Sequence, residues 1–335
     1  MERKVSIYDI AKHLNLSVAT VSYVINNKGK ISQETKDRVN QAIKDLGYVM
    51  NSTARTLSTG KSHLIGLLLP LSSSNSGFIQ NPFYGEFIAG LRMEISNYDY
   101  DIVISNLKSI DKLVDWISSR GLDGLIMLGK YPREIYEKIK EIDIPVVLTD
   151  VYEDYSKEFL NVRVDDEYGV YLATKYLLDN GHTKIGFVGN RLQSLVDHQR
   201  YLGYKKAIAE AKIENEYTFD CFSTFDDGYM IADDIINSDV TGVVCASDIL
   251  AIGIISKYHN KGIEVPKNLS LVGFDDIQNS KYVYPALTTI RQDIEQKAVV
   301  AAKLVLDSLE KSENNVTLQV LEPKLVIRDS VNKIG

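Results

Sequence analysis

The chain has few cysteines and no long apolar run. Its 335 residues include only Cys221 and Cys245, too few for a disulfide framework or a four-cysteine zinc site. The longest apolar run, LIGLLLPL at 64–71, is less than half of the roughly 20 residues that a bilayer span needs. The N-terminal MERKVSIYDI has no apolar core after its charges, which argues against a secretory signal. We therefore expect a soluble, cytoplasmic protein with no membrane partner.

Sequence motifs of enzymes and metal sites are missing as well. There is no HExxH, no GxSxG, no CxxC pair and no complete phosphate loop. The five histidines have no metal-ligand spacing, and GFVGN at 186–190 lacks the full dinucleotide fingerprint. These absences predict a protein that is not an enzyme and that needs no cofactor or metal.

Charge is distributed unevenly along the chain. Residues 1–62 contain ten Lys and Arg against five Asp and Glu, although the whole chain has a net charge of −7. A basic head on an acidic body is typical of a polyanion-binding module joined to another domain, but chance can produce an excess of this size. At about 150 residues per domain, the length predicts two or three domains.

Three short helices are predicted within the head. Ser6, Ser17 and Ser32 each precede apolar residues at helical spacing, and Asp9 follows Ser6 at the position of a capping box. A tight turn separates the first two helices, as in a helix-turn-helix. Gly47 is placed to end the third helix.

The second of these helices would turn small and hydroxyl-bearing side chains outward. Its apolar stripe, Val21, Val24 and Ile25, would face the core of the head. Small side chains allow a helix to approach a DNA groove closely, and hydroxyls can bond phosphates or base edges. A small helical bundle with a neutral surface would show the same pattern. The outward residues are Ser17, Val18, Ala19, Thr20, Ser22 and Tyr23.

Short apolar runs alternate with helical patterns from Leu64 onward. The runs include LIGLLL, DIVISN, GLIML, PVVLTD, KIGFVG, GVVCAS and SLVGFDD. Apolar strands that alternate with helices predict parallel sheets covered on both faces. Roughly 270 residues exceed one core, so we expect two lobes.

The segments VSIYDIAKHLNLSVATVSYVINN and ISQETKDRVNQAIKDLGYVMNSTARTLSTGKS resemble the DNA-binding head of the LacI/GalR repressor family. In that family the second helix enters the major groove, so the resemblance puts Val18, Ala19 and Tyr23 at base-reading positions. Most members have arginine where Tyr23 stands, and tyrosine cannot make the bidentate contact to guanine. The DNA-binding residues that the resemblance implies for the head are Ser6, Ser17, Val18, Ala19, Thr20, Ser22, Tyr23 and Asn26.

A hinge follows the head in this family. There the hinge helix forms only on DNA, as a pair across the dimer axis, and a leucine wedges between base steps of the minor groove. Leu57 matches this wedge, and an ordinary exposed linker is the alternative. We predict a helix-turn-helix domain at 1–50, and a hinge helix and linker at 51–62. The hinge residues implied to contact DNA are Asn51, Ala54, Arg55 and Leu57.

Residues 63–335 resemble the periplasmic-binding-protein fold of the family's effector core. The motifs NPFYGEFIAGL, DGLIMLG, LVGFDDI and PALTTIRQDI stand in the family's order. The fold class implied is a multidomain protein with an all-α helix-turn-helix head and an α/β core of two parallel-sheet lobes. One lobe would hold about 63–162 and 291–320, and the other about 163–290 and 321–335. A small ligand would bind between them, at the carboxyl ends of strands.

The resemblance also implies an effector-binding set. Arg200 matches the family's effector arginine, and Asp275 in GFDD matches a carboxylate that bonds the ligand. Two carboxylates, an arginine and aromatic rings suit a sugar. The carboxylates could instead cap turns, Phe83 and Phe222 could be core residues, and Arg200 could form a surface ion pair. The set is Phe83, Tyr84, Asp150, His198, Arg200, Phe222, Ser247, Asp248 and Asp275.

These observations favour a transcriptional repressor whose affinity for double-stranded operator DNA is controlled by a small molecule. A homodimer is expected, because one head reads a half-site and a palindrome matches a twofold axis. A sugar or sugar phosphate is the favoured effector, and a nucleobase or a phosphoprotein co-regulator is the alternative. A solute-binding protein of a transport system would have no use for residues 1–62, and an α/β enzyme would need a catalytic set that the sequence lacks.

Overall fold

A computed structural model describes most of the chain and divides it into two compact units. The described residues are 5–25, 29–48, 56, 60–70, 81–106, 110–310 and 317–334. One unit contains residues 1–64 together with 117–123, and the other contains 65–116 together with 124–335. Within the described part of the chain, no helix is long and apolar enough to cross a membrane.

The head is a bundle of three helices, as predicted. Ser32 accepts a hydrogen bond from the backbone of Thr35, and Gly47 ends the third helix with a φ of 63°. The carboxylate of Asp9 accepts hydrogen bonds from the backbone and the hydroxyl of Ser6. The helices are α1 (Ile7–Leu14), α2 (Val18–Ile25) and α3 (Gln33–Leu46), and their buried core is Ile10, Ala11, Val21, Val24, Val39 and Ala42.

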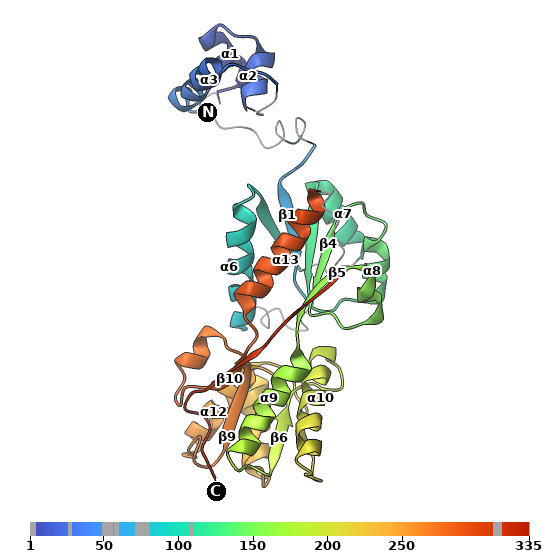
Figure 1. Cartoon of the computed structure of the whole chain (residues 1–335), viewed down its shortest axis with the longest axis vertical. Helices are drawn as coiled ribbons and strands as arrows, with labels where there is room; N and C mark the ends of the chain where they lie inside the picture. Colours follow the sequence, from blue (N-terminus) through green and yellow to red (C-terminus); the bar gives the residue numbers. More distant parts are fainter. Residues whose placement is uncertain are drawn as a thin grey trace. The chain divides into compact units, whose positions relative to one another are not determined.

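The first lobe of the core is built on a six-stranded sheet. Its strand order is β11-β5-β4-β3-β1-β2. Helices α6 and α13 pack side by side against it, although they are about 200 residues apart in the sequence (Figure 1). The elements are β1 (Leu64–Leu68), α6 (Pro82–Ser96), β2 (Asp101–Ser105), α7 (Ile110–Arg120), β3 (Gly124–Leu128), α8 (Arg133–Ile139), β4 (Val146–Thr149), η1 (Asp154–Glu158), β5 (Leu160–Val164), α13 (Ile294–Leu309) and β11 (Leu318–Leu321).

The second lobe repeats this plan with strand order β12-β10-β9-β8-β6-β7. All its pairs are parallel except that between β10 and β12. The elements are α9 (Asp166–Asp179), β6 (Ile185–Val188), α10 (Leu195–Glu210), β7 (Tyr217–Phe219), α11 (Phe225–Ile236), β8 (Gly242–Cys245), α12 (Asp248–Asn260), β9 (Ser270–Asp275), η2 (Gln278–Lys281), β10 (Thr288–Arg291) and β12 (Lys324–Val326).

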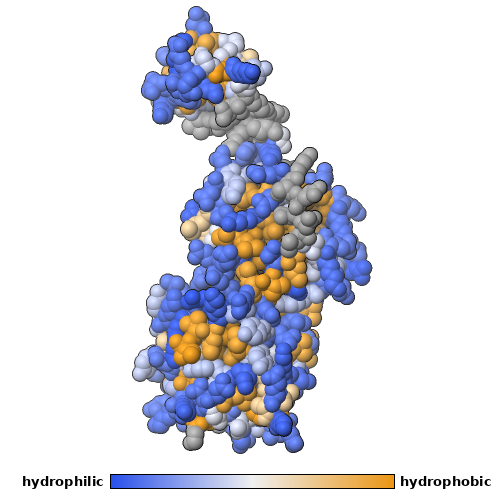
Figure 2. Space-filling view, viewed as in Figure 1, coloured by the Kyte–Doolittle hydropathy of each residue, from blue (hydrophilic) through white to orange (hydrophobic). Residues whose placement is uncertain are grey.

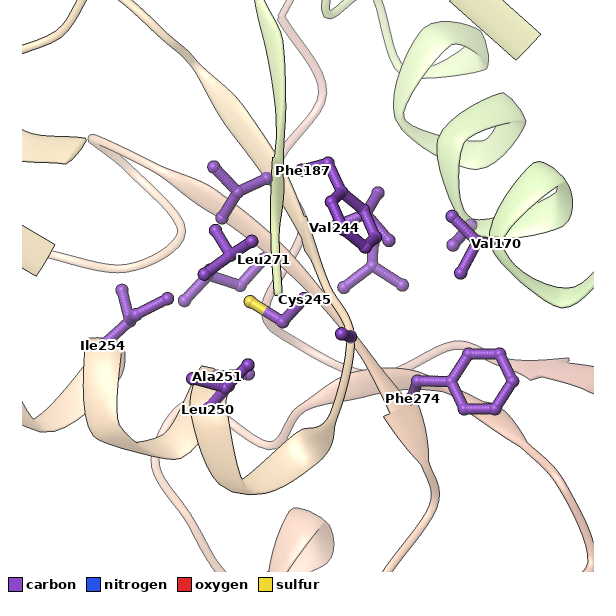
Figure 3. Packing of buried hydrophobic residues seen from close by; sticks show 14 of the residues in the cluster. Val170, Phe187, Val244, Cys245, Leu250, Ala251, Ile254, Leu271 and Phe274 are labelled. Carbon is purple, nitrogen blue, oxygen red and sulfur yellow. The ribbon is translucent and has the colours of Figure 1, made fainter. Parts of the chain in front are cut away.

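Helices cover both faces of the second sheet. Figure 3 shows Leu250 and Ile254 of α12 near Leu271 and Cys245, and Val170 of α9 on the other side of the strands. Helices α9 and α10 approach closely because Gly203 has no side chain, since a Cβ there would lie 2.0 Å from the carbonyl oxygen of Glu167. The predicted fold class, a helical head and an α/β core of two parallel-sheet lobes, is confirmed.

The chain passes between the two sheets three times. The passages follow β5, β10 and β11, at residues 164–166, 291–294 and 321–324. Each sheet is thus completed by a distant part of the chain, β11 in the first lobe and β12 in the second. The carboxyl ends of β4 and β9 belong to different lobes.

Candidate DNA-binding face and effector cavity

Helix α2 presents a small, partly hydroxylated face to solvent. Ala19 is exposed, and Tyr23 is 50% exposed. Ser17 caps the helix, because its oxygen accepts the backbone N–H of Thr20 at 3.0 Å. The remaining predicted residues, Val18, Thr20 and Ser22, are half-buried. The helix therefore has an accessible face of the kind predicted, and its contact with DNA stays a prediction.

One further exposed residue of the head was missed by the sequence analysis. Tyr8 of α1 is 69% exposed, which makes it the most open large apolar side chain of the described head. Tyr8 lies outside the apolar stripe of α1, and this position in the sequence could have predicted its exposure. Ser6, by contrast, is half-buried and bonded to Asp9. The predicted contacts Asn26, Asn51, Ala54, Arg55 and Leu57 lie outside the described residues.

The core contains a cavity of about 170 Å³ that brings together residues from both lobes. Of the nine predicted effector residues, it is lined by Phe83, Tyr84, Asp150, Arg200, Ser247 and Asp275. The first two begin α6, where Asn81 accepts the backbone N–H of Phe83. The other lining residues, which the sequence analysis missed, are Pro70, Asn81, Leu128, Gly129, Val196, Asp197, Ser223 and Gln292.

Two of the carboxylates reach this cavity from sharply turned backbone. Asp150 follows β4 with a φ of 57°, and Asp275 ends β9 with a φ of 123°. Positive φ values are uncommon outside glycine, and Asp is among the residues that tolerate them. Such positions gather at ligand sites, where a strand end must turn a side chain toward the bound molecule.

Arg200 is the central cation of the cavity wall. Its Nε donates to Oδ1 of Asp166 at 2.7 Å, its Nη1 donates to the carbonyl of Ala246, and Nη1 lies 3.9 Å from Oδ1 of Asp275. The guanidinium carbon lies 3.7 Å from the centre of the Phe274 ring. Burial raises the pKa of Asp275, and the charges of Arg200 and Lys297 oppose that rise. Arg200 is therefore a buried ion-pair partner as well as a lining residue.

Three predicted effector residues do not line this cavity. His198 lines a neighbouring hollow of about 390 Å³ with Lys130 and Arg191. Phe222 is 55% exposed, and the next residue, Ser223, lines the cavity instead.

Asp248 points into the interior of the second lobe. Its carboxylate accepts hydrogen bonds from the hydroxyls of Ser280 and Thr289 and from the backbone N–H of Ile277. Burial raises its pKa well above the ordinary value for aspartate. The placement of Asp248 at the cleft was therefore wrong, because its oxygens are occupied within the lobe, and its role is to tie α12 to η2 and β10.

The lining combines several acceptor groups with one strong donor and two aromatic rings. Asp150, Asp197 and Asp275 supply carboxylate oxygens, and Arg200 supplies the guanidinium. Oxygen acceptors bind hydroxyl hydrogens, the guanidinium binds ligand oxygens, and rings pack against C–H faces. In the described part of the chain, no group of three His, Cys, Asp or Glu side chains could hold a metal ion.

Comparison with known proteins gives consistent matches along the chain. Residues 6–51 match bacterial regulatory proteins of the lacI family, and residues 174–331 match a periplasmic binding protein-like domain. The chain is 32% identical over 340 residues to the transcriptional repressor PurR of Vibrio vulnificus (strain CMCP6), covering 98% of this chain and 99% of the relative.

Solved structures share the fold. The lac repressor dimer bound to operator and the anti-inducer ONPF has a TM-score of 0.84 at 22% identity, covering 98% of this chain and all of that one. A LacI family transcriptional regulator from Enterococcus faecium with bound ribose has a TM-score of 0.73 at 28% identity, covering 81% of this chain and all of that one.

Proposed function

Since the chain belongs to the lacI family of bacterial regulatory proteins, we propose that its core binds a small sugar and thereby controls the affinity of its head for operator DNA. The chain is a DNA-binding transcriptional repressor and not an enzyme. The finer assignments, namely the sugar, the residues that bind it and the coupling to DNA, form the proposal. We also propose that it acts in the cytoplasm, where the operator is.

The observation that carries the proposal is the meeting of Asp150, Arg200 and Asp275 with Phe83 in one cavity. A sugar offers hydroxyl hydrogens to carboxylates, hydroxyl oxygens to a guanidinium and C–H faces to aromatic rings. The cavity volume of about 170 Å³ suits one sugar unit better than an oligosaccharide. The ribose-bound relative from Enterococcus faecium supports the same chemical class.

Operator binding in this proposal uses the exposed face of α2 and a pair of heads. A homodimer is supported by the operator-bound dimer of the lac repressor, which shares the fold. Figure 2 shows hydrophobic patches on one face of the core. Ligand binding between lobes would shift the separation of the two hinges, with a coupling free energy of about 1–3 kcal/mol. The coupling is reciprocal, so operator DNA should change sugar affinity by the same factor.

The sugar is tested by calorimetric titration of the full chain. The ligands are D-ribose, D-glucose and D-ribose 5-phosphate, with hypoxanthine as the competing class that the PurR relatives suggest. We expect a sugar to bind and hypoxanthine not to bind. Arg200→Lys should weaken binding, because a lysine keeps the charge but loses the fork of donors. Binding of hypoxanthine with no response to any sugar would replace the sugar by a nucleobase.

DNA recognition is tested by gel shift with operator sequences selected from random DNA. We expect Tyr23→Ala to weaken binding to the selected sequence more than to unrelated DNA, because base contacts specify while phosphate contacts do not. Tyr98→Ala is the matched control, since Tyr98 is a half-exposed tyrosine of the core. Equal losses on both DNAs would remove Tyr23 from sequence reading.

A further inference from the structure

A lysine without solvent contact lies behind the wall of the effector cavity. Lys297 is in the first turn of α13, and its exposed fraction is 0%. It does not line the cavity, yet it touches three residues that do: Asp150, Gln292 and Phe83. The first contact joins segments that are 147 residues apart. Full burial of a lysine is rare unless the ammonium group is paired.

All three hydrogens of this ammonium group have an acceptor available. Nζ lies 2.7 Å from Oδ1 and 2.9 Å from Oδ2 of Asp150, and it also donates to Oε1 of Gln292. A lysine has three donors and no acceptor, so these contacts exhaust its capacity. Nζ also lies 5.6 Å from the centre of the Phe83 ring, within the range of a cation–π contact.

The lysine also determines which end of the Gln292 amide faces the second lobe. A side-chain amide has one acceptor end and one donor end. Because Oε1 accepts from Lys297, Nε2 is turned toward Asp275 and donates to its Oδ1. Gln292 immediately follows β10, on a passage between the lobes. One cation thus orders a carboxylate of the first lobe and, through an amide, a carboxylate of the second.

We propose that Lys297 is a positioning residue of the effector site, which orients Asp150 and Gln292 so that both walls of the cavity present carboxylate acceptors to the ligand. The positioning itself is independent of the ligand, whereas the ligand class rests on the proposed function. Oxygens of Asp150 and Asp275 then favour a ligand that has hydroxyl hydrogens at both ends. A ligand that turned a carbonyl or carboxylate oxygen toward Asp150 or Asp275 would meet an acceptor and be disfavoured, whereas the same oxygen beside Arg200 would meet a donor.

The charge is not needed to fill the volume. Methionine is nearly as long and unbranched, and replacing both members of a buried ion pair by apolar groups is often neutral or stabilising, although removing Lys297 alone leaves Asp150 without its counter-charge. A buried lysine is therefore weak support for a role in stability alone. What an apolar residue cannot do is hold both oxygens of Asp150 and fix the orientation of the Gln292 amide.

The first test needs no ligand. Crystal structures of the full chain are compared for the wild type, Lys297→Met and Lys303→Met. Lys303 is the matched control, because it lies on the same helix with its side chain 54% exposed. We expect the Asp150 carboxylate and the Gln292 amide to turn in Lys297→Met and to stay in place in Lys303→Met. Unchanged side chains at both positions in Lys297→Met would overturn the proposal.

The second test measures binding of D-ribose and D-glucose to the same proteins by calorimetry. For whichever sugar binds the wild type, we expect Lys297→Met to lower affinity by about tenfold or more, and Lys303→Met to leave it unchanged. Gln292→Glu keeps Lys297 but replaces the donor that faces Asp275 by an acceptor, and it should also weaken binding. Unaltered affinity in both site variants would refute the positioning role.

These outcomes separate the inference from the function on which it partly rests. If neither sugar binds the wild type, the proposed sugar is wrong, and the ligand-free structures still decide whether Lys297 orients the walls. If Lys297→Met does not fold, as judged by circular dichroism, Gln292→Glu carries both tests. In that variant we expect the side chain at 292 to turn away from Asp275 while Lys297 keeps its contacts with Asp150.

Discussion

Replacement of Arg200 by methionine should destabilise the core strongly. The guanidinium is the counter-charge of Asp166 at 2.7 Å and lies 3.9 Å from Asp275, and all three side chains are buried. Loss of one partner leaves a buried charge without compensation, at a cost of about 3–5 kcal/mol. We expect Arg200→Met to lower the free energy of unfolding by about this amount.

The effect should depend on pH in a defined direction. In the wild type, burial raises the pKa of Asp275 and the charge of Arg200 opposes the rise. Without Arg200 this pKa should rise further, so the folded state would bind a proton more tightly than the unfolded chain. A raised carboxylate pKa makes stability fall as pH rises through the folded-state pKa. The loss in Arg200→Met should therefore be larger at pH 8 than at pH 5.5.

The assay is urea unfolding at both pH values, followed by circular dichroism. Arg191→Met is the control, because this arginine pairs with Asp220 at 3.0 Å but its side chain is 25% exposed, and its loss should cost less than about 1 kcal/mol. Asp166→Asn combined with Arg200→Met should cost less than the two single losses together. A loss below about 1 kcal/mol in Arg200→Met, or no change with pH, would refute the reasoning.

Three further outcomes are expected from measurements of stability, the first two by equilibrium unfolding. Burial lowers the pKa of His182, so the free energy of unfolding should fall as pH drops below the unfolded value of about 6.5, and this fall should be smaller in His182→Gln. Gly203→Ala should destabilise the second lobe by about 1–3 kcal/mol, because the added Cβ would lie 2.0 Å from the carbonyl oxygen of Glu167; an equal loss in Gly85→Ala, where a Cβ would meet nothing within 4 Å, would contradict this. Val21→Ala should lower head stability by about 1–3 kcal/mol, measured by the thermal loss of operator binding, since the side chain is fully buried.

Sequence patterns predicted the head well because its signals are local. The serine caps and the glycine stop lie within a few residues of the helices that they bound. The alternation of apolar runs with helical patterns likewise predicted parallel sheets, since hydrophobic periodicity reports which faces are buried. The exposed face of α2 follows from the same periodicity.

The lining of the cavity between the lobes was predicted only in part. Residues at strand ends, such as Asp150 and Asp275, reach the cavity because carboxyl ends of parallel strands face one edge of each sheet. Asp248 also follows a strand, but its oxygens bond to Ser280 and Thr289, which the sequence pattern could not show. Lys297 was missed because a single lysine in a helix is normally expected to face solvent.

By itself, the sequence determined the helices of the head and the alternation of strands and helices in the core. Through family resemblance it also predicted the separation into a DNA-binding head and a ligand-binding core. Only the tertiary structure decided which of several similar carboxylates face the cavity and which form hydrogen bonds inside a lobe. The physical reason is the sequence separation over which each interaction acts. Caps and periodicity act over one or two turns, whereas the contact between Asp150 and Lys297 spans 147 residues and exists only once both lobes have folded.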